Sequence, residues 1–364
     1  MKKILFLLIL LIVVFSPRIY WQLKPATTLD ISVVDKTVPL DDYREHNGLF
    51  WLLTNEKITR LDGELYDIGR DYVGYDPYDN KAMEPYNIDR FVDLIYIADT
   101  YGVYADDLEE VVEGDRSKKI YGGMDLLEWN AVMASKGPDT MLIAEYNSFA
   151  TPTDGTTREI MEQNLGVDWS GWSGRYFEDL NSEEIPSWLI DNYETQYNKE
   201  WAFEGAGLAF VHLNDKVVVF DEKSMNKNVM FSLTEEGKEK FQKAKPSDYA
   251  YWFDIITPLS GTTVYAKYDL DLTEDALKEL RDANIPTSFP AIVRHEMNNT
   301  YYFAGDYADY SKDNLKKWQR SDAFMNIFSN DATNFFWVSY IPIMRVILED
   351  IKQEKVQSND KNER

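Results

Sequence analysis

The sequence predicts an α/β fold, a mainly parallel doubly wound sheet with a hairpin-bearing insertion, after an N-terminal membrane anchor. Three observations lead to this class. Apolar runs of strand length alternate with helical segments, an acidic residue ends each of the first three runs, and two lysines precede an apolar N-terminal stretch. We divide the chain into a signal anchor at 1–24, an extracytoplasmic α/β domain at 25–350 with the insertion at about 167–286, and a disordered tail at 351–364.

The N-terminal segment has the pattern of a membrane signal. Lys2 and Lys3 precede a continuous apolar run at 4–15, which matches the charged and hydrophobic regions of a secretory signal. No small-x-small cleavage site follows, while Tyr20 and Trp21 suit a membrane interface and extend the span to about 20 residues. We therefore expect an uncleaved single-pass anchor in the cell membrane with the body outside, and a cleaved signal is the alternative.

Composition excludes several classes of function. The chain has no cysteine, so disulfides and thiolate nucleophiles are absent. A formal charge of -25 opposes the phosphate backbone, so no nucleic acid is expected as a partner. No loop has EF-hand spacing, and we expect no cofactor and no metal site, although the acidity leaves a structural calcium ion open. Aromatic residues make up 14% of the chain, and such rings can stack on flat ligand faces.

The first strand and helix follow the anchor directly. LDISVVD is apolar and rich in β-branched residues, which predicts a strand that ends at Asp35. DDYREHNGLFWLLTNEKI predicts a helix with Asp41 or Asp42 as its N-cap. Residues 61–87 are dense in Asp, Gly, Pro and Tyr, which predicts a long loop of the kind that often carries function.

The same alternation continues to Gly166. VDLIYIADTYG predicts a second strand ending at Asp99, MDLLEWNAVMASKG a helix, and MLIAEY a third strand ending at Glu145. In the helix that follows, Thr156 and Glu159 have capping-box spacing, and Gly166 suits the helix C-terminus. Such alternation indicates parallel strands joined by right-handed crossovers.

Later segments predict a mixture of hairpins and helices. Asn214 and Asp215 separate two apolar runs, as in a β-hairpin. LTEDALKELRDANIP predicts a helix that Thr273 opens and that ends before Pro286. FPAIVRHEMNNTYYFAGDYAD predicts two strands, and NFFWVSYIPIMRVILEDIKQ a last helix before the polar tail.

In order and spacing, the strand ends at Asp35, Asp99 and Glu145, the late FAGD strand and the terminal helix resemble the class I glutamine amidotransferase-like superfamily, including its trehalose-utilisation (ThuA-like) relatives. The resemblance covers about 29–166 and 290–348 and lies at the level of the fold. It implies a nucleophile elbow, Gly-x-Cys-x-Gly, after the third strand. This chain has Glu-Tyr-Asn-Ser-Phe there, so the resemblance implies a catalytically degenerate domain without amidotransferase activity.

Ser148 lies in this turn, but its surroundings argue against a nucleophile. A strained nucleophile elbow needs small neighbours, and Tyr146 and Phe149 are large. A serine also needs a base within hydrogen-bond reach. Of the three histidines only His295 is a candidate partner, and His212, in the expected hairpin, is interpreted as structural. We therefore reject Ser148 as a nucleophile.

The predicted site is a polar rim at the carboxyl ends of the strands, where doubly wound sheets bind ligands. The binding candidates on this rim are Asp35, Lys36, Arg44, His46, Tyr101, Asn147 and Asp306. The Gly-rich segment VDWSGWSGRYFEDL is interpreted as a lid loop over the rim, and it adds Trp169, Trp172, Arg175 and Tyr176. Helix capping and pinning of the loop by its own rings are the structural alternatives.

We expect a non-enzymatic protein that binds a cell-envelope glycan or a protein partner, because the nucleophile is missing while the rim is polar and aromatic. Two alternatives stay open. Asp99 and Glu145 are the catalytic candidates of a glycan-active hydrolase, in which paired carboxylates act as acid and base on a glycosidic bond. A structural component of an envelope complex would instead show an exposed apolar patch.

Overall fold

The structure is a computed structural model that describes residue 12 and residues 15–16, 18–83, 89–108, 117–310 and 335–362. Most of the predicted anchor therefore lies outside the described residues. Residues 18–23 are helical, and Trp21 packs against the domain, where its indole N–H donates to the carbonyl oxygen of Thr54 at 2.9 Å. Within the described part of the chain, no helix is long and apolar enough to cross a membrane.

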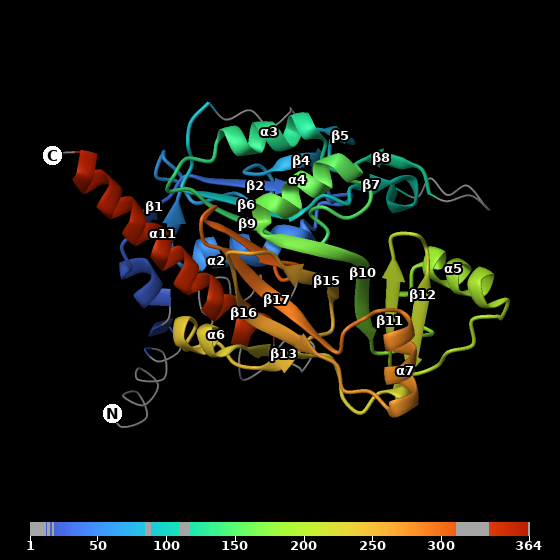
Figure 1. The fold of residues 1–364 in the computed structure, drawn as a ribbon. Coiled ribbons are helices and arrows are strands. Elements are labelled where there is room, and N and C mark those ends of the chain that lie inside the picture. The colour runs from blue at the N-terminus through green and yellow to red at the C-terminus, as the bar shows by residue number, and fades with distance from the viewer. Residues whose placement is uncertain are drawn as a thin grey trace, which may run out of the picture.

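A ten-stranded sheet forms the centre of the molecule, in the order β14-β13-β16-β17-β18-β9-β6-β2-β4-β5 (Figure 1). Its parallel part consists of β18 (Thr300–Phe303), β9 (Met141–Ala144), β6 (Leu94–Asp99), β2 (Ile31–Asp35) and β4 (Val73–Asp76). Antiparallel strands extend it on both sides: β17 (Ser288–His295), β16 (Thr262–Asp269), β13 (Met230–Leu233) and β14 (Ser247–Asp248) beyond β18, and β5 (Lys81–Ala82) beyond β4. The predicted α/β class with a large parallel central sheet is confirmed.

Helices cover both faces of this sheet (Figure 1). They are α3 (Leu126–Ala134) and α4 (Gly155–Leu165) on one face, and α2 (Arg44–Asn55) and α11 (Ile341–Asn362) on the other. Strand residues alternate between the two layers: Ile95 and Ile97 pack with α3 and α4, whereas Tyr96 packs with α2 and α11. This alternation explains why the parallel strands read as continuous apolar runs.

The segment 61–87 contains more regular structure than the predicted long loop. β4 and β5 lie within it, and β4 pairs with β2. At Gly74 a Cβ atom would lie 1.5 Å from the carbonyl oxygen of Asp35. Only glycine therefore allows the two backbones to approach so closely.

The start of α2 differs from the predicted cap. The residue before the helix is Tyr43, in the left-handed conformation with φ 52° and without a side-chain cap. Neither Asp41 nor Asp42 is therefore the N-cap, because the chain turns sharply at Tyr43 before the first helical residue.

The start of α4 also differs, whereas its end does not. Asp154 caps the helix and accepts hydrogen bonds from the amides of Thr156 and Thr157. Thr156 therefore lies inside the helix, so the predicted capping box with Glu159 is wrong. Gly166 ends the helix with φ 75°, in the left-handed conformation predicted for it.

A second, antiparallel sheet lies beside the first, in the order β12-β11-β10-β15. Its strands are β10 (Val167–Phe177), β11 (Gly207–His212), β12 (Val217–Asp221) and β15 (Trp252–Pro258). β11 and β12 are the predicted hairpin at Asn214 and Asp215, which is confirmed. β10 is a strand and not the predicted lid loop. Its small residues make room for rings, since Gly174 packs against the side chains of Phe210 and Phe253.

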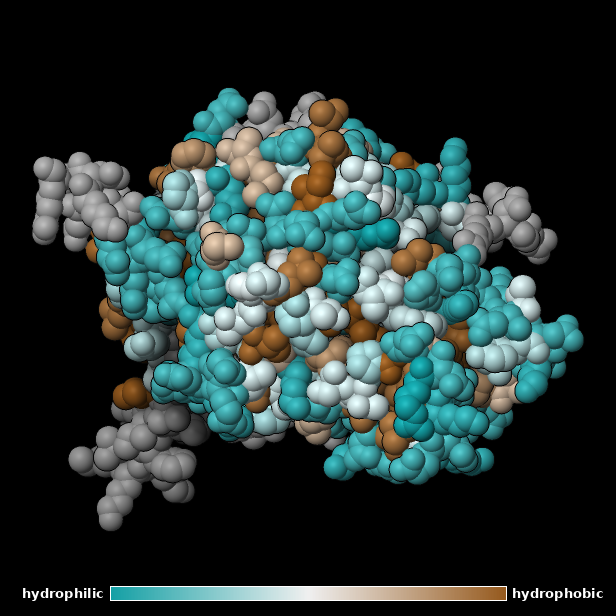
Figure 2. Space-filling model, in the orientation of Figure 1, coloured by the Kyte–Doolittle hydropathy of each residue, from teal (hydrophilic) through white to brown (hydrophobic). Residues whose placement is uncertain are grey.

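The remaining elements are short or peripheral. They are β1 (Thr27–Thr28), β3 (Ile58–Thr59), β7 (Val103–Tyr104), β8 (Lys119–Tyr121), α5 (Ser187–Tyr197), α6 (Glu235–Lys240), α7 (Glu274–Asp282) and the helical turns η1 (Ala105–Leu108), η2 (Glu222–Ser224) and η3 (Phe336–Tyr340). Thr273 precedes α7 as predicted. On the face drawn in Figure 2, described hydrophobic residues are scattered among hydrophilic ones without forming one broad patch.

The C-terminal segment corrects the predicted disordered tail. α11 continues through the polar residues to Asn362. Ile351 is buried, and the ammonium group of Lys355 lies 2.6 Å from the carboxylate of Asp93. These contacts with the domain stabilise a segment that composition alone would leave unfolded.

Candidate functional site

The three predicted carboxylates stand on adjacent parallel strands at their carboxyl ends. Asp35 ends β2 and Asp99 ends β6, and the two residues are paired in register. Glu145 directly follows β9, and its amide donates to the carbonyl oxygen of Ile97 in β6 at 2.9 Å. The carboxyl edge of the sheet is therefore acidic, as the strand ends predict.

The side chain of Asp35 is paired with another residue of the protein. Its Oδ2 atom lies 2.5 Å from Nδ1 of His46, and both side chains are completely buried. The other ring nitrogen of His46 lies 3.0 Å from the carbonyl oxygen of Ile68. Both ring nitrogens of His46 therefore contact oxygen atoms, so the ring is held between the end of β2 and the backbone at Ile68.

Glu145 is equally enclosed. One carboxylate oxygen accepts from the hydroxyl of Tyr96, and the other accepts from the amides of Tyr307 at 3.1 Å and Ala308 at 3.0 Å. Burial raises the pKa of Glu145 to about 8, against the opposing effect of these hydrogen bonds. The side chain connects β6 with the segment after β18 and does not reach solvent.

Asp99 lies between them and is also satisfied internally. Its Oδ1 accepts from the Thr37 hydroxyl at 2.7 Å and the Tyr101 amide at 2.5 Å, while the Asn147 side chain lies 3.4 Å from Oδ2. Burial raises the pKa of Asp99 to about 7. With Glu145 enclosed, this arrangement does not offer a substrate the acid and base pair considered for a hydrolase.

Lys36 is turned away from the predicted rim. Its ammonium group donates to the carbonyl oxygen of Gly123 at 2.5 Å and to the carboxylate of Glu128 at 2.6 Å, over the ring of Tyr121. The side chain thus ties β2 to α3 and cannot contact a ligand beside Arg44.

The two tryptophans of β10 do not form a lid. Trp172 is buried, with its ring 4.9 Å from that of His212 in an edge-on contact. Trp169 donates to the carbonyl oxygen of Trp172 at 2.9 Å and packs against Phe149. Because both rings pack within the second sheet and against the main domain, they are structural.

Arg175, farther along β10, does reach the edge. Burial raises the pKa of Asp309, and the charges of Arg44 and then Arg175 oppose that rise. The guanidinium of Arg175 also lies 2.5 Å from the carboxylate of Glu184. Tyr176 packs against the main core. Of the four β10 candidates, only Arg175 therefore acts on the acidic edge.

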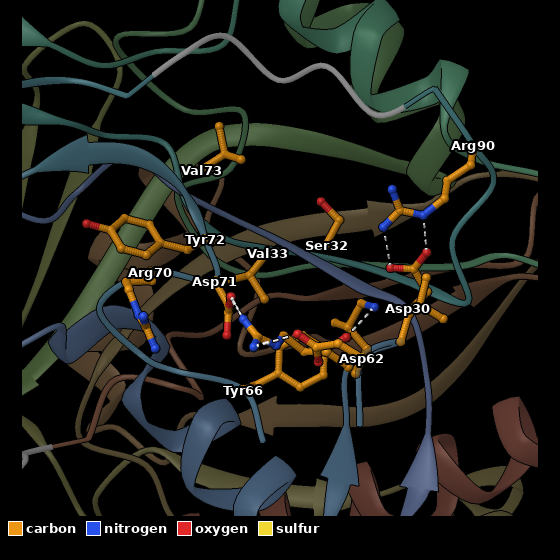
Figure 3. Close-up of a pocket in the computed structure, with 13 residues that line it drawn as sticks. Asp30, Ser32, Val33, Asp62, Tyr66, Arg70, Asp71, Tyr72, Val73 and Arg90 are labelled. Atoms are coloured by element: carbon orange, nitrogen blue, oxygen red, sulfur yellow. Dashed lines mark hydrogen bonds and ion pairs between the residues drawn. The ribbon is translucent and has the colours of Figure 1, made fainter. Parts of the chain in front are cut away.

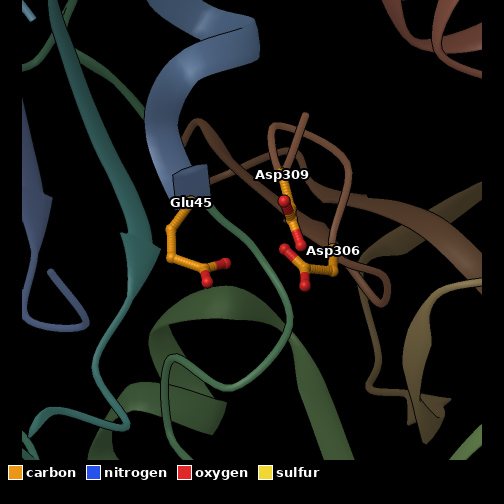
Figure 4. A group of neighbouring side chains, drawn as sticks. All are labelled: Glu45, Asp306 and Asp309. Atoms are coloured by element: carbon orange, nitrogen blue, oxygen red, sulfur yellow. The ribbon is translucent and has the colours of Figure 1, made fainter. Parts of the chain in front are cut away.

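A buried acidic cluster lies at this edge, and the sequence identified only one of its members, Asp306. It consists of Glu45, Asp306 and Asp309, whose oxygen atoms lie within 4.8 Å of one another (Figure 4). Glu45 comes from the first turn of α2, and the two aspartates from the segment after β18. The Nε atom of Arg44 lies 2.9 Å from Oδ1 of Asp309.

The cluster is electrostatically strained. Burial first, and then the charge of Asp309, raise the pKa values of Glu45 and Asp306 well above their usual range. Both missed members lie near candidates identified from the sequence. Glu45 follows Arg44, and Asp309 lies in the same FAGDYAD segment as Asp306. The sequence does not show where these two side chains point, since it does not place an α2 side chain against a loop from the far end of the chain.

Half-buried aromatic rings border the cluster. The ring of Tyr146 stacks on that of Trp252, with 6.3 Å between centroids and 7° between planes. After burial, the charges that raise the pKa of Tyr146 include that of Asp306, and those acting on Tyr251 are led by that of Asp309. Carboxylates and ring faces therefore occur together here, a combination suited to polyhydroxylated ligands.

Ser148 is not a nucleophile in this structure. Its hydroxyl donates to the backbone oxygen of Glu145 at 2.5 Å and is completely buried. His295 pairs with Thr300 at the amino end of β18, at the opposite end of the sheet from this turn. Asn147, at the centre of the turn, has φ 67°.

Two cavities lie elsewhere. One of about 400 Å³ lies beside the amino half of β2, where Arg90 pairs with Asp30 and Arg60 with Asp62 and Asp71 (Figure 3). A second, of about 470 Å³, lies between the second sheet and α7, and Trp172, Tyr197, His212, Lys216, Glu279 and Asn284 are among the residues that line it. Neither includes a residue of the acidic cluster.

Comparison with known proteins gives a distant similarity of fold. No protein-family model matches the sequence, and no curated protein matches it. Among solved structures, the chain is similar to a ThuA-like protein from Bacteroides uniformis ATCC 8492, with 7% sequence identity, a TM-score of 0.39, and coverage of 88% of this chain and 91% of that one. The match describes a distant resemblance of fold and does not extend to activity.

Proposed function

We propose that this chain is a membrane-anchored extracytoplasmic protein that binds a cell-envelope glycan at the carboxyl edge of its sheet without cleaving it. One observation carries the proposal: the half-buried rings of Tyr146 and Tyr251 lie near the carboxylates of Asp306 and Asp309. Sugar hydroxyls donate well to carboxylates, while the apolar face of a sugar packs on an aromatic ring.

Other residues support binding without cleavage. Asn147 occupies the centre of the turn where the resembling superfamily has its nucleophile, and the oxygens of Asp99 and Glu145 are already engaged by donors of the protein. The remaining carboxylates lie close to Arg44, which can hold a second polar group of the ligand. The membrane location comes from the paired lysines and apolar run at the N-terminus.

Retention on insoluble cell-wall polysaccharide tests the proposal, with the full-length chain in detergent. Tyr146→Ala removes a ring beside the cluster, and we expect about tenfold weaker retention. Tyr193→Ala is the matched control, because it removes a partly buried ring from α5, in a different cluster. Both variants are compared by circular dichroism to confirm folding.

Two outcomes would contradict the proposal. Equal retention of the wild type and a folded Tyr146→Ala variant would remove the assigned site. Release of soluble reducing sugar by the wild type would show cleavage and favour the hydrolase instead.

A further inference from the structure

We propose that Glu45, Asp306 and Asp309 together bind one calcium ion. The inference concerns the same edge of the sheet as the proposed function, but it does not depend on glycan binding. It rests on the spacing of the three carboxylates, on their charge balance and on the environment of Asp306.

The three carboxylates lie close enough together for one cation to reach them all. One oxygen from each residue lies within 4.8 Å of the others. Calcium–oxygen bonds are about 2.3–2.6 Å long, so two ligands of one calcium ion can be up to about 5 Å apart. Magnesium–oxygen bonds of about 2.0–2.1 Å limit that separation to about 4.2 Å. Calcium therefore accepts a wider range of ligand separations than magnesium, and the spacing of the cluster is compatible with it.

The charge balance leaves a deficit that a divalent cation would fill. When ionised, the three carboxylates carry three negative charges, and Arg44 offers one positive charge through its contacts with Asp309 and Glu45. Among the described residues, two negative charges then remain in a buried region. Arg175 already pairs with Glu184, so its charge is shared.

The environment of Asp306 points to a missing ligand. Its side chain belongs to a residue that is only 8% exposed, and within the described residues no hydrogen bond or ion pair reaches its carboxylate. The carboxylate instead points toward Glu45 and Asp309 (Figure 4). Burying a carboxylate without a donor carries a free-energy cost. A bound cation removes it by supplying the missing positive charge.

Isothermal titration of the chelator-treated full-length chain with calcium chloride tests the inference. We expect one site, a rise in melting temperature of about 3–5 °C at a hundredfold excess over the dissociation constant, and a weaker response to magnesium. Asp306→Asn should bind calcium at least tenfold more weakly. In chelator it should melt no lower than the wild type, because it removes a repulsive charge from the cluster.

Asp191→Asn is the matched control, since it removes the same charge from an exposed position on α5. It should bind calcium like the wild type. The inference is overturned if the wild type shows neither heat of binding nor a calcium-dependent melting shift, or if Asp306→Asn binds calcium as tightly as the control. Calcium binding without glycan retention would leave this inference standing and contradict the proposed function, and glycan retention without calcium binding would do the reverse.

Discussion

Nδ1 of His46 lies 2.5 Å from Oδ2 of Asp35, and neither side chain is exposed to solvent. The pair joins the first turn of α2 to the carboxyl end of β2. The other nitrogen of His46 faces the carbonyl oxygen of Ile68. A doubly protonated ring would satisfy both contacts, and the pair would then be an ion pair in which each partner compensates the buried charge of the other. It supports the helix that carries Glu45.

Breaking this pair should therefore destabilise the domain strongly. We expect His46→Gln to lower the free energy of unfolding by about 3–5 kcal/mol, since it leaves Asp35 buried without its counter-charge. Urea denaturation followed by circular dichroism measures the change. Arg70→Ala, which removes the exposed pair with Asp67, is the control and should cost less than about 1 kcal/mol. Equal small effects would mean that the buried pair is not ionic.

Stability should fall as pH rises through the range set by Asp99 and Glu145. Their folded pKa values of about 7 and about 8 lie above the value of about 4 for unfolded carboxylic acids. The folded state then holds more protons than the unfolded state between about pH 4 and 8, so the free energy of unfolding decreases across that window. Melting temperatures should be higher at pH 5.5 than at pH 8.5, and the opposite slope would contradict the raised pKa values.

Glu145→Gln should flatten that dependence. A glutamine resembles the neutral acid: its oxygen can accept from the amides of Tyr307 and Ala308, while its NH₂ group donates to the hydroxyl oxygen of Tyr96. We expect the variant to match the wild type at pH 5.5 and to be more stable at pH 8.5. Glu145→Ala should be less stable at both values, because it leaves two buried amides without an acceptor.

The close packing of β10 predicts the effect of a single methyl group. In Gly174→Ala the new Cβ would lie 2.7 Å from the ring of Phe253 and 2.8 Å from that of Phe210, so we expect a loss of about 1–3 kcal/mol. Gly155→Ala is the matched control, because its Cβ would meet only the end of Arg158 at 3.7 Å. Chemical denaturation distinguishes the two. A mobile lid at Gly174 would tolerate the change as well as Gly155 does.

Hydrogen exchange tests the C-terminal helix. Amides from Ile351 to residue 357 should be protected, since α11 continues through them and Lys355 is tied to Asp93. Mass spectrometry of peptic fragments measures this directly. Exchange at the rate of an unfolded peptide would restore the disordered tail that composition predicts.

The N-terminal segment predicts stable membrane attachment. The full chain, expressed in a bacterial host, should sediment with membranes and resist extraction by high salt, because the apolar run at 4–15 would remain in the bilayer. Fractionation followed by N-terminal sequencing checks this. Soluble protein in the medium with a new N-terminus near Pro25 would indicate a cleaved signal instead.

The sequence by itself determined the α/β class and the strand ends. This information is local in the sequence, because each continuous apolar run ends at Asp35, Asp99 or Glu145. A strand buried on both faces needs apolar residues at every position and polar ones only where it leaves the core. The end of α4 at Gly166 could also be predicted from neighbouring residues alone, since a left-handed residue at a helix end favours glycine. These features depend on neighbours only a few residues apart.

Only the tertiary structure decided which of the acidic residues are available to bind a ligand. Glu145 is enclosed because Tyr307 and Ala308, from the other half of the chain, donate to it. Among the described residues, no donor reaches the carboxylate of Asp306, which faces Glu45 from α2. Likewise, β10 is a strand because β11 and β15, both later in the chain, pair with it. The hydrogen bonds and charges that determine each outcome come from residues distant in sequence, and only folding brings them together.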